Sequence, residues 1–219
     1  MKYVNKLSFK QIFWIFLVGS VIGAYYEELL FIVRNYLRTR TFAWQPRRGV
    51  FWGPISPVYG IGAIVLSMFL GNKKESIIKT FFKATILGGV VEYILSYLQE
   101  FFIGTSSWNY SAKFLNINGR TTVIYMLFWG LIGVLFVKLI YPGLLKFVDY
   151  SSKILKGKLT TILFVILAFD ITISWSALIR QRFRRENLPP ITVVGKLYDE
   201  YFNDEYIKSK FPNMKMKLN

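Results

Sequence analysis

Carboxylic acids placed inside apolar sequence are the side chains of this chain that could do chemistry. Glu92 lies in the apolar stretch 80–103, and on a helix its face would also carry small or polar residues at spacings of three and four. These residues are Thr85, Gly88, Ser96 and Glu100. Glu27 ends a similar stripe that runs from Gly19 through Gly23. Because a buried carboxyl can bind a substrate or act as a general base, Glu92 and Glu27 are the catalytic candidates.

An ionised carboxylate near the centre of a bilayer costs roughly 3 kcal/mol on insertion scales. We therefore expect the two acidic stripes to face one another, an arginine or water rather than lipid. Small residues on the same faces would let the helices approach closely. The alternative interpretation is structural, with the carboxyls pinning helices together or reaching to the interface.

Arginines stand directly before a segment rich in glycine and proline, RRGVFWGPISPVYGIG at 47–62. The residues that prevent a regular helix there include Gly49, Gly53, Pro54, Pro57 and Gly60. Irregular backbone at membrane depth persists only where protein or a water-filled cavity covers it. We predict that 44–57 dips into the membrane and carries Arg47 or Arg48 toward Glu27, Glu92 or Glu100, with Tyr59 beside them. An ordinary exposed loop is the alternative.

A second irregular segment, GTSSWNYSAKFLNINGR at 104–120, follows Glu100 directly. It contains an Asn-Gly pair that is typical of a turn. Its position predicts that it shares a binding site with the end of the acidic stripe. The residues that would line this site are Trp108, Tyr110, Asn116, Asn118 and Arg120, with Gly119 in a backbone role.

The elements that must position these groups are apolar helices. The chain has 219 residues, of which 53% are hydrophobic, and its mean hydropathy is +0.37. Roughly 20 helical residues cross a hydrocarbon core of about 30 Å. The sequence therefore predicts an all-α integral membrane protein rather than a soluble helical bundle. Its five expected spans are 12–33, 57–71, 80–103, 122–141 and 159–179.

Charge and composition exclude several kinds of chemistry. The chain has no histidine and no cysteine, which excludes disulfides, imidazole or thiolate catalysis and the common zinc sites. We therefore expect no metal site and no cofactor. The net charge is +16, and beside apolar spans we attribute it to binding of anionic lipid headgroups rather than nucleic acid. The positive charges divide evenly between the two sides, so the orientation stays open.

The composition changes after about residue 180. We expect a transmembrane domain at 1–180 and a juxtamembrane tail at 181–219 that begins with the basic stretch RQRFRRENLPP. Residues 192–209 have apolar side chains at helical spacing, which predicts an amphipathic helix lying on the membrane, on a partner or on the protein's own loops. Residues 210–219 are expected to fray.

The ordered motifs of these segments, over about residues 10–145, resemble the CmpB-type, or type IV, family of bacterial ABC-transporter permeases. The chain differs from the family pattern in having Arg47 in place of an asparagine and Asn109 in place of an aspartate. The resemblance implies a multi-spanning permease. The residues that carry it are Gly23, Glu27, Arg48, Gly49, Gly53, Pro54, Pro57, Tyr59, Gly60, Glu92, Ser96, Glu100, Trp108, Tyr110, Ser111, Asn116, Asn118, Gly119, Arg120, Phe128, Trp129, Gly130 and Pro142.

Three classes of function are open. A permease in the bacterial cytoplasmic membrane would need a separate ATPase subunit, because the phosphate-binding motif G-x-x-x-x-G-K-[ST] of such enzymes does not occur in the 219 residues given. It would also pair with a second membrane subunit or a second copy. Alternatively, an intramembrane enzyme could hold a phosphorylated or anionic lipid with Arg48 and Arg120 and use Glu92 or Glu27 as a base. The third class is a structural or regulatory membrane subunit.

Overall fold

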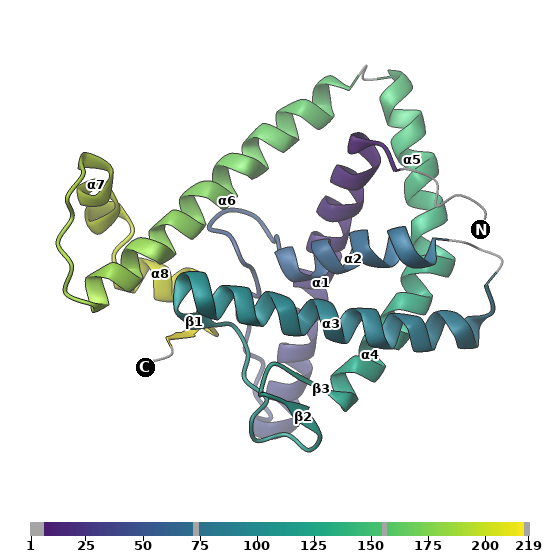
Figure 1. Cartoon of the computed structure of the whole chain (residues 1–219), viewed down its shortest axis with the longest axis horizontal. Helices are drawn as coiled ribbons and strands as arrows, with labels where there is room; N and C mark the ends of the chain where they lie inside the picture. The colour runs from purple at the N-terminus through teal and green to yellow at the C-terminus, as the bar shows by residue number, and fades with distance from the viewer. Residues whose placement is uncertain (1–6, 72–74, 155–156, 217–219) are drawn as a thin grey trace.

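Long helices form almost all of the molecule (Figure 1). The computed structural model describes residues 7–71, 75–154 and 157–216. Four helical segments are long and apolar enough to cross a membrane. They are α1 (Phe9–Thr39), α3 (Ile77–Ile103), the continuous segment Val123–Tyr150 and α6 (Lys158–Arg185). The prediction of an all-α membrane protein is confirmed.

The second predicted span is too short to cross a bilayer. Helix α2 (Pro57–Leu70) has 14 residues, which gives a length of about 21 Å against a hydrocarbon core of about 30 Å. Pro57 occupies the first turn of α2, where its missing N–H costs no hydrogen bond. The helix therefore begins where the irregular segment ends, and it packs on α1 and α3. The described residues contain four long spans and this short apolar helix, instead of five spans.

The fourth span continues beyond its predicted end at residue 141. It consists of α4 (Val123–Leu135), the π-helical turn η1 (Phe136–Ile140) and α5 (Tyr141–Ile154). A proline inside a regular α-helix clashes with the carbonyl four residues earlier. The widened turn directly before Pro142 allows the helix to pass this proline without ending. A prediction from hydropathy and proline position alone therefore ends this helix too early.

Small residues allow the central helices to approach closely. An added Cβ at Gly19 of α1 would lie 2.6 Å from the Cβ of Ala63 in α2. At Gly88 of α3, an added Cβ would overlap the Trp129 ring of α4. Close backbone approach of this kind is how membrane helices gain packing energy without a hydrophobic driving force. The glycines of the predicted stripes thus serve helix packing.

The C-terminal tail folds back onto the loops between the helices. It contains α7 (Val193–Tyr201), α8 (Asp204–Lys210) and β4 (Lys215–Met216). Strand β4 pairs antiparallel with β1 (Thr105–Ser106), directly after α3. Phe211 is only 2% exposed, so the prediction that the chain frays from residue 210 is wrong for the part that is described. Residues 217–219 of that prediction lie outside the described residues.

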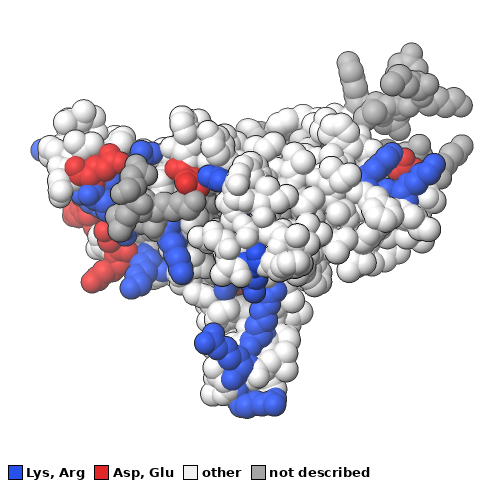
Figure 2. Space-filling model, turned by 60° about the horizontal axis from the view of Figure 1, so that its bottom comes forward, with Lys and Arg blue, Asp and Glu red and all other residues white. Residues whose placement is uncertain are grey.

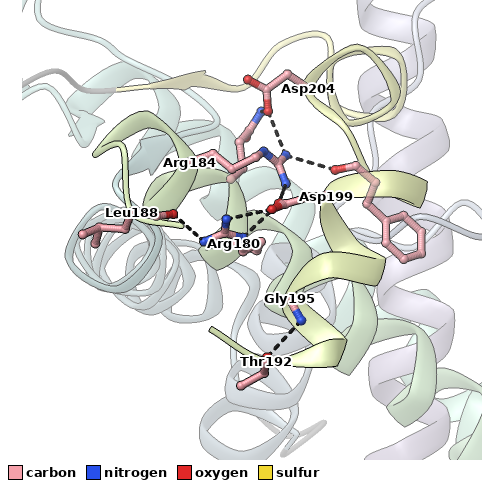
Figure 3. Close-up of polar contacts among 9 residues, drawn as sticks. Arg180, Arg184, Leu188, Thr192, Gly195, Asp199 and Asp204 are labelled. Atoms are coloured by element: carbon pink, nitrogen blue, oxygen red, sulfur yellow. Dashed lines mark hydrogen bonds and ion pairs between the residues drawn. The ribbon is translucent and has the colours of Figure 1, made fainter. Parts of the chain in front are cut away.

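Ion pairs between the end of α6 and the tail fix this arrangement (Figure 3). Arg180 donates two hydrogen bonds to Asp199, at 2.9 and 2.7 Å. Arg184 donates to Asp199 and to Asp204, both at 2.8 Å. Hydrogen bonds from Arg180 are the main reason that the pKa of Asp199 is lowered. The single predicted helix at 192–209 is two short helices, and these arginines hold both of them.

Candidate functional site

Glu27 lies between α1 and α2. The Tyr59 hydroxyl donates a hydrogen bond of 2.9 Å to Oε1 of Glu27. The Tyr59 ring is stacked on Trp129 of α4 at a centroid distance of 5.4 Å and lies edge-on to Tyr26 at 6.3 Å. An added Cβ at Gly23 would overlap the Tyr59 ring. The absence of a side chain at Gly23 is therefore what admits this tyrosine beside the carboxyl.

Glu92 is buried, with 7% of its surface exposed. Its Oε1 accepts a hydrogen bond of 2.9 Å from the Tyr110 hydroxyl, and its Oε2 accepts one of 2.6 Å from the Thr121 hydroxyl. Both donors belong to the segment that joins α3 to α4. The hairpin of β2 (Asn116–Ile117) and β3 (Thr121–Thr122) folds this segment back over α3.

Local turn geometry places the two donors. The backbone N–H of Tyr110 donates to the carbonyl of Gly119 at 2.8 Å. Gly119 has φ +69°, a left-handed conformation that glycine adopts without strain. The side chain of Asn116 accepts from the Gly119 N–H at 3.0 Å and donates to the carbonyls of Ser111 and Lys113. Asn116 and Gly119 therefore shape the loop rather than face the carboxyl.

The two carboxyls belong to one polar cluster. Burial raises the pKa of Tyr110 well above its usual range, and the nearby Glu92 and Glu27 carboxyls raise it further. The charge of Glu27 acts on Tyr110, which indicates that the Tyr59–Glu27 pair lies within electrostatic range of the Tyr110–Glu92 pair. We call Glu27, Tyr59, Glu92, Tyr110 and Thr121 the central cluster. It is formed by α1, α2, α3 and the α3–α4 segment.

Of the two neighbouring arginines, Arg47 faces α1, where its guanidinium lies over the ring of Phe31 at 4.9 Å and within electrostatic range of Glu27. Burial lowers the pKa of the Arg47 guanidinium, and Glu27 and Glu28 oppose that change. The backbone N–H of Arg47 also donates to Glu28 at 3.2 Å. Arg47 thus lies on the α1 side of the 44–57 segment, and the expectation that an arginine of this segment serves Glu27 stays a prediction.

Arg48 lies elsewhere. Its Nη1 donates to the carbonyl of Phe51 at 3.4 Å. It also lies near Tyr206 of α8, where it opposes the increase in tyrosine pKa that burial causes. Successive residues in an extended segment point to opposite sides, so Arg47 faces α1 while Arg48 faces the tail. Of the two arginines that the sequence offered for the glutamates, Arg48 therefore lies toward the tail.

Glu100 and Arg120 form a second polar group at the end of α3. Arg120 Nη2 lies 2.8 Å from Glu100 Oε2, and its guanidinium lies over the rings of Tyr93 and Tyr97 at 5.6 and 5.5 Å. Trp108 Nε1 donates to the carbonyl of Arg120 at 2.8 Å. These groups border an open pocket with a volume of about 290 Å³, lined by Tyr97, Glu100, Phe101, Arg120 and Arg182.

The remaining predicted residues have packing or backbone positions. Ser96 is buried on α3, and Asn118 donates to the Tyr93 hydroxyl at 2.9 Å. The Gly49 N–H closes the 44–57 segment by donating to the carbonyl of Ile55 at 2.8 Å, and Gly53 has φ +80°. Pro54 lies in the same irregular stretch. An added Cβ at Gly60 would overlap Ser20 and Phe16 of α1.

Sequence reasoning missed Thr121, and it did not predict that the weaker polar stripe of Asp170 and Ser174 anchors the 44–57 segment. Asp170 and Ser174 of α6 both accept a hydrogen bond from the Phe51 N–H, at 3.1 and 2.8 Å. The available signal was an acid and a serine four residues apart in an apolar helix. Thr121 had no such signal, because its role depends on how the hairpin folds. Among the described residues there is no group of three or more acidic side chains that could hold a metal ion.

The fold and the polar cluster define a class: an all-α, multi-pass membrane protein with carboxyls held between its helices. Within that class, the family model described as "Putative ABC-transporter type IV" matches residues 14–175. The match covers more than half of the chain, and the chain therefore belongs to this family. The resemblance inferred from the sequence motifs is confirmed. Comparisons with curated proteins and with solved structures gave no match.

Proposed function

We propose that the chain is a transport subunit of the bacterial cytoplasmic membrane and that the central cluster contacts its substrate. The observation that carries this proposal is the environment of Glu92. Among the described residues, the side chains hydrogen-bonded to this buried carboxyl are the neutral hydroxyls of Tyr110 and Thr121. An acidic side chain at membrane depth is costly and is typical of a substrate or ion pathway.

The arrangement favours a substrate that carries a positive charge or an exchangeable proton. A hydroxyl donor can rotate away from a carboxyl at a smaller cost than breaking a buried ion pair, which is about 3–5 kcal/mol. Glu27, held by Tyr59, supplies a second carboxyl in the same cluster. Arg47, on the irregular 44–57 segment and within electrostatic range of Glu27, would respond to the charge of this pair. Transporters often place such sites where irregular segments meet helices.

A separate ATPase subunit would supply the energy, because the phosphate-binding motif of such enzymes does not occur in these residues. Four long helices would also form only part of a pathway, so a second membrane subunit or a second copy of the chain is proposed. The test is affinity purification in a gentle detergent. We expect a nucleotide-binding subunit to co-purify and its ATP hydrolysis to change when this chain is present. Purification without such a subunit would contradict the proposal.

The alternative function, an intramembrane enzyme that acts on a phosphorylated or anionic lipid, is tested by a second experiment. In that alternative, Arg48 and Arg120 would hold the lipid phosphate. However, Arg48 faces Phe51 and Tyr206, and Arg120 pairs with Glu100. The experiment compares the lipids of cells with and without the gene, by mass spectrometry. Accumulation of one phosphorylated lipid in the deletion strain, reversed by wild-type protein but not by Glu92→Gln, would favour the enzyme over the transport subunit.

A further inference from the structure

The end of α1 and the segment that follows it form a basic arm, defined here as residues 34–47. The arm contains four arginines and no acidic residue. Figure 2 shows Lys and Arg side chains gathered on a part of the molecule that projects from the body. Helix α1 has 31 residues and a length of about 46 Å, which exceeds a hydrocarbon core of about 30 Å. Its last turns therefore extend beyond the apolar part of the span.

The arm is an ordered hairpin-like structure. The chain reverses at Arg40, which has φ +58° and whose N–H donates to the Tyr36 carbonyl at 2.8 Å. Asn35 Nδ2 donates to the carbonyl of Thr41 at 2.7 Å, and the rings of Tyr36 and Phe42 are stacked at 4.7 Å. After this reversal the chain runs back along α1.

The returning part of the arm places an aromatic side chain against α1. Trp44 Nε1 donates to Oε2 of Glu28 at 3.2 Å, which lies within the apolar stretch of α1. The polar edge of the indole is thus satisfied internally while 62% of Trp44 stays exposed. Leu37 is 66% exposed and Phe42 is 80% exposed. Exposed aromatic and aliphatic side chains beside arginines are typical of the water–lipid interface.

The arginines of the arm are available to an external anion. Arg34, Arg38 and Arg40 are exposed, and within the part of the chain that the structure describes none of them forms an ion pair. The Arg40 guanidinium lies over the Tyr36 ring at 5.9 Å, which leaves its charge uncompensated. By contrast, Arg180, Arg182 and Arg184 near the end of α6 are paired with acidic residues of the tail or with Glu186. In the part of the chain that the structure describes, the arm therefore holds three exposed arginines close together in sequence that form no ion pair.

We propose that the arm is a docking surface for anionic phospholipid headgroups. Arg34, Arg38 and Arg40 bind the headgroup phosphates, while Leu37, Phe42 and Trp44 enter the interface next to them. Polybasic segments next to a span attract the negative surface of a membrane by this mechanism. An acidic protein would need only the charge, whereas the exposed apolar side chains of Leu37, Phe42 and Trp44 beside the arginines favour lipid. This inference does not depend on the transport proposal.

The absence of cysteine from the chain allows a site-specific probe. Leu37→Cys, labelled with a polarity-sensitive fluorophore, is reconstituted into nanodiscs of phosphatidylcholine alone or with phosphatidylglycerol. We expect a blue-shifted emission in the anionic discs that high salt reverses. Adding Arg38→Gln and Arg40→Gln should lower the ratio of docked to free arm by about thirtyfold, from the interaction of each cation with an anionic surface.

The matched control removes two exposed cations from the tail by Lys196→Gln and Lys208→Gln. This control has the same net charge as the arm variant, and we expect its emission to equal that of the parent. Identical emission in both disc types would overturn the proposal. So would an emission shift that occurs only when an acidic partner protein is added, because the arm would then be a protein-binding surface. Thermal unfolding of each variant checks that the fold is retained.

Discussion

The hydroxyl donors of Glu92 are the residues on which the central cluster depends most. Tyr110 donates to one carboxyl oxygen and Thr121 to the other, so removal of either hydroxyl leaves part of a buried acid without a donor. The Tyr110 ring is also stacked on Tyr125 at 4.6 Å. A tyrosine-to-phenylalanine change at this position therefore removes the hydrogen bond and keeps the ring packing, so it measures the contribution of the hydrogen bond alone.

We expect Tyr110→Phe to lower the free energy of unfolding by about 1–3 kcal/mol, because a buried acceptor loses its donor. The control is Tyr201→Phe, since Tyr201 is exposed. Thermal unfolding in detergent measures both variants. Equal melting temperatures for the two variants would show that the Tyr110–Glu92 hydrogen bond contributes nothing to stability.

Asp199 gives the tail a predictable dependence on pH. Hydrogen bonds from Arg180 lower the pKa of Asp199 in the folded protein, so the stabilisation is complete above the unfolded pKa of about 3.9. It is lost as pH falls below that value and through the lower folded pKa. We expect the protection of α7 against hydrogen exchange to be constant from neutral pH down to about 5 and to fall at lower pH. Asp199→Asn should reduce this protection at neutral pH, and unchanged protection would contradict the role of the ion pair.

At the level of single residues, the sequence predicted the two carboxyls of the central cluster better than the side chains that contact them. The spacing of three and four identified Glu27 and Glu92, because helical periodicity is a local property. Choosing between Arg47 and Arg48 requires the path of an irregular segment, which long-range contacts with α1 and α6 determine. Thr121 was missed for the same reason, since it reaches Glu92 only after the hairpin of β2 and β3 forms.

At the scale of elements, glycine contacts decide how closely the helices approach. Gly88 of α3 faces Trp129 of α4, where an added Cβ would overlap the ring. By contrast, an added Cβ at Gly143 of α5 would meet no described atom within 4 Å. Alanine substitutions at these two glycines therefore distinguish the effect of close packing on stability from the effect of helix propensity.

We expect Gly88→Ala to lower the free energy of unfolding by about 1–3 kcal/mol through overpacking. Gly143→Ala should leave stability unchanged or raise it by up to about 1 kcal/mol, because alanine favours the helix. Thermal unfolding of the two purified variants measures the difference. A Gly88→Ala protein as stable as Gly143→Ala would mean that α3 and α4 are not packed this closely.

The type of these elements was predictable, but their lengths were less so. Hydropathy identified every apolar helix because burial in lipid requires apolar side chains along the whole segment. The stretch predicted as a span at 57–71 has almost the length of α2, and the error was to count so short a stretch as a span. Hydropathy did not show that η1 lets the helix continue past Pro142, because that difference comes from backbone geometry at proline, which an average over side chains does not contain.

At the scale of the whole molecule, the tail connects two loops that frame the central cluster. Phe51, in the 44–57 segment, is fully buried and is stacked on Phe202 at 4.9 Å and on Phe211 at 5.4 Å. Strand β4 pairs with β1, just before the segment that carries Tyr110. The amphipathic pattern at 192–209 did not predict this return of the chain, because the contacts join residues about 100 positions or more apart.

We expect Phe211→Ala to lower the free energy of unfolding by about 3–5 kcal/mol, as loss of a buried ring does. Hydrogen exchange should increase in both 48–56 and 104–110. Phe114→Ala is the control, because Phe114 is 78% exposed. Faster exchange confined to the tail itself would contradict the connection between the tail and the loops.

We propose that Glu92 belongs to a substrate-contacting site of a transport subunit. The most direct measurement is ATP hydrolysis by the co-purified nucleotide-binding subunit in nanodiscs, with wild-type chain, Glu92→Gln and the exposed control Glu186→Gln. The account predicts that Glu92→Gln assembles normally but changes the hydrolysis rate at least about tenfold, the effect of one lost interaction of roughly 1.4 kcal/mol, whereas Glu186→Gln matches wild type. Equal rates for all three assembled complexes would contradict it.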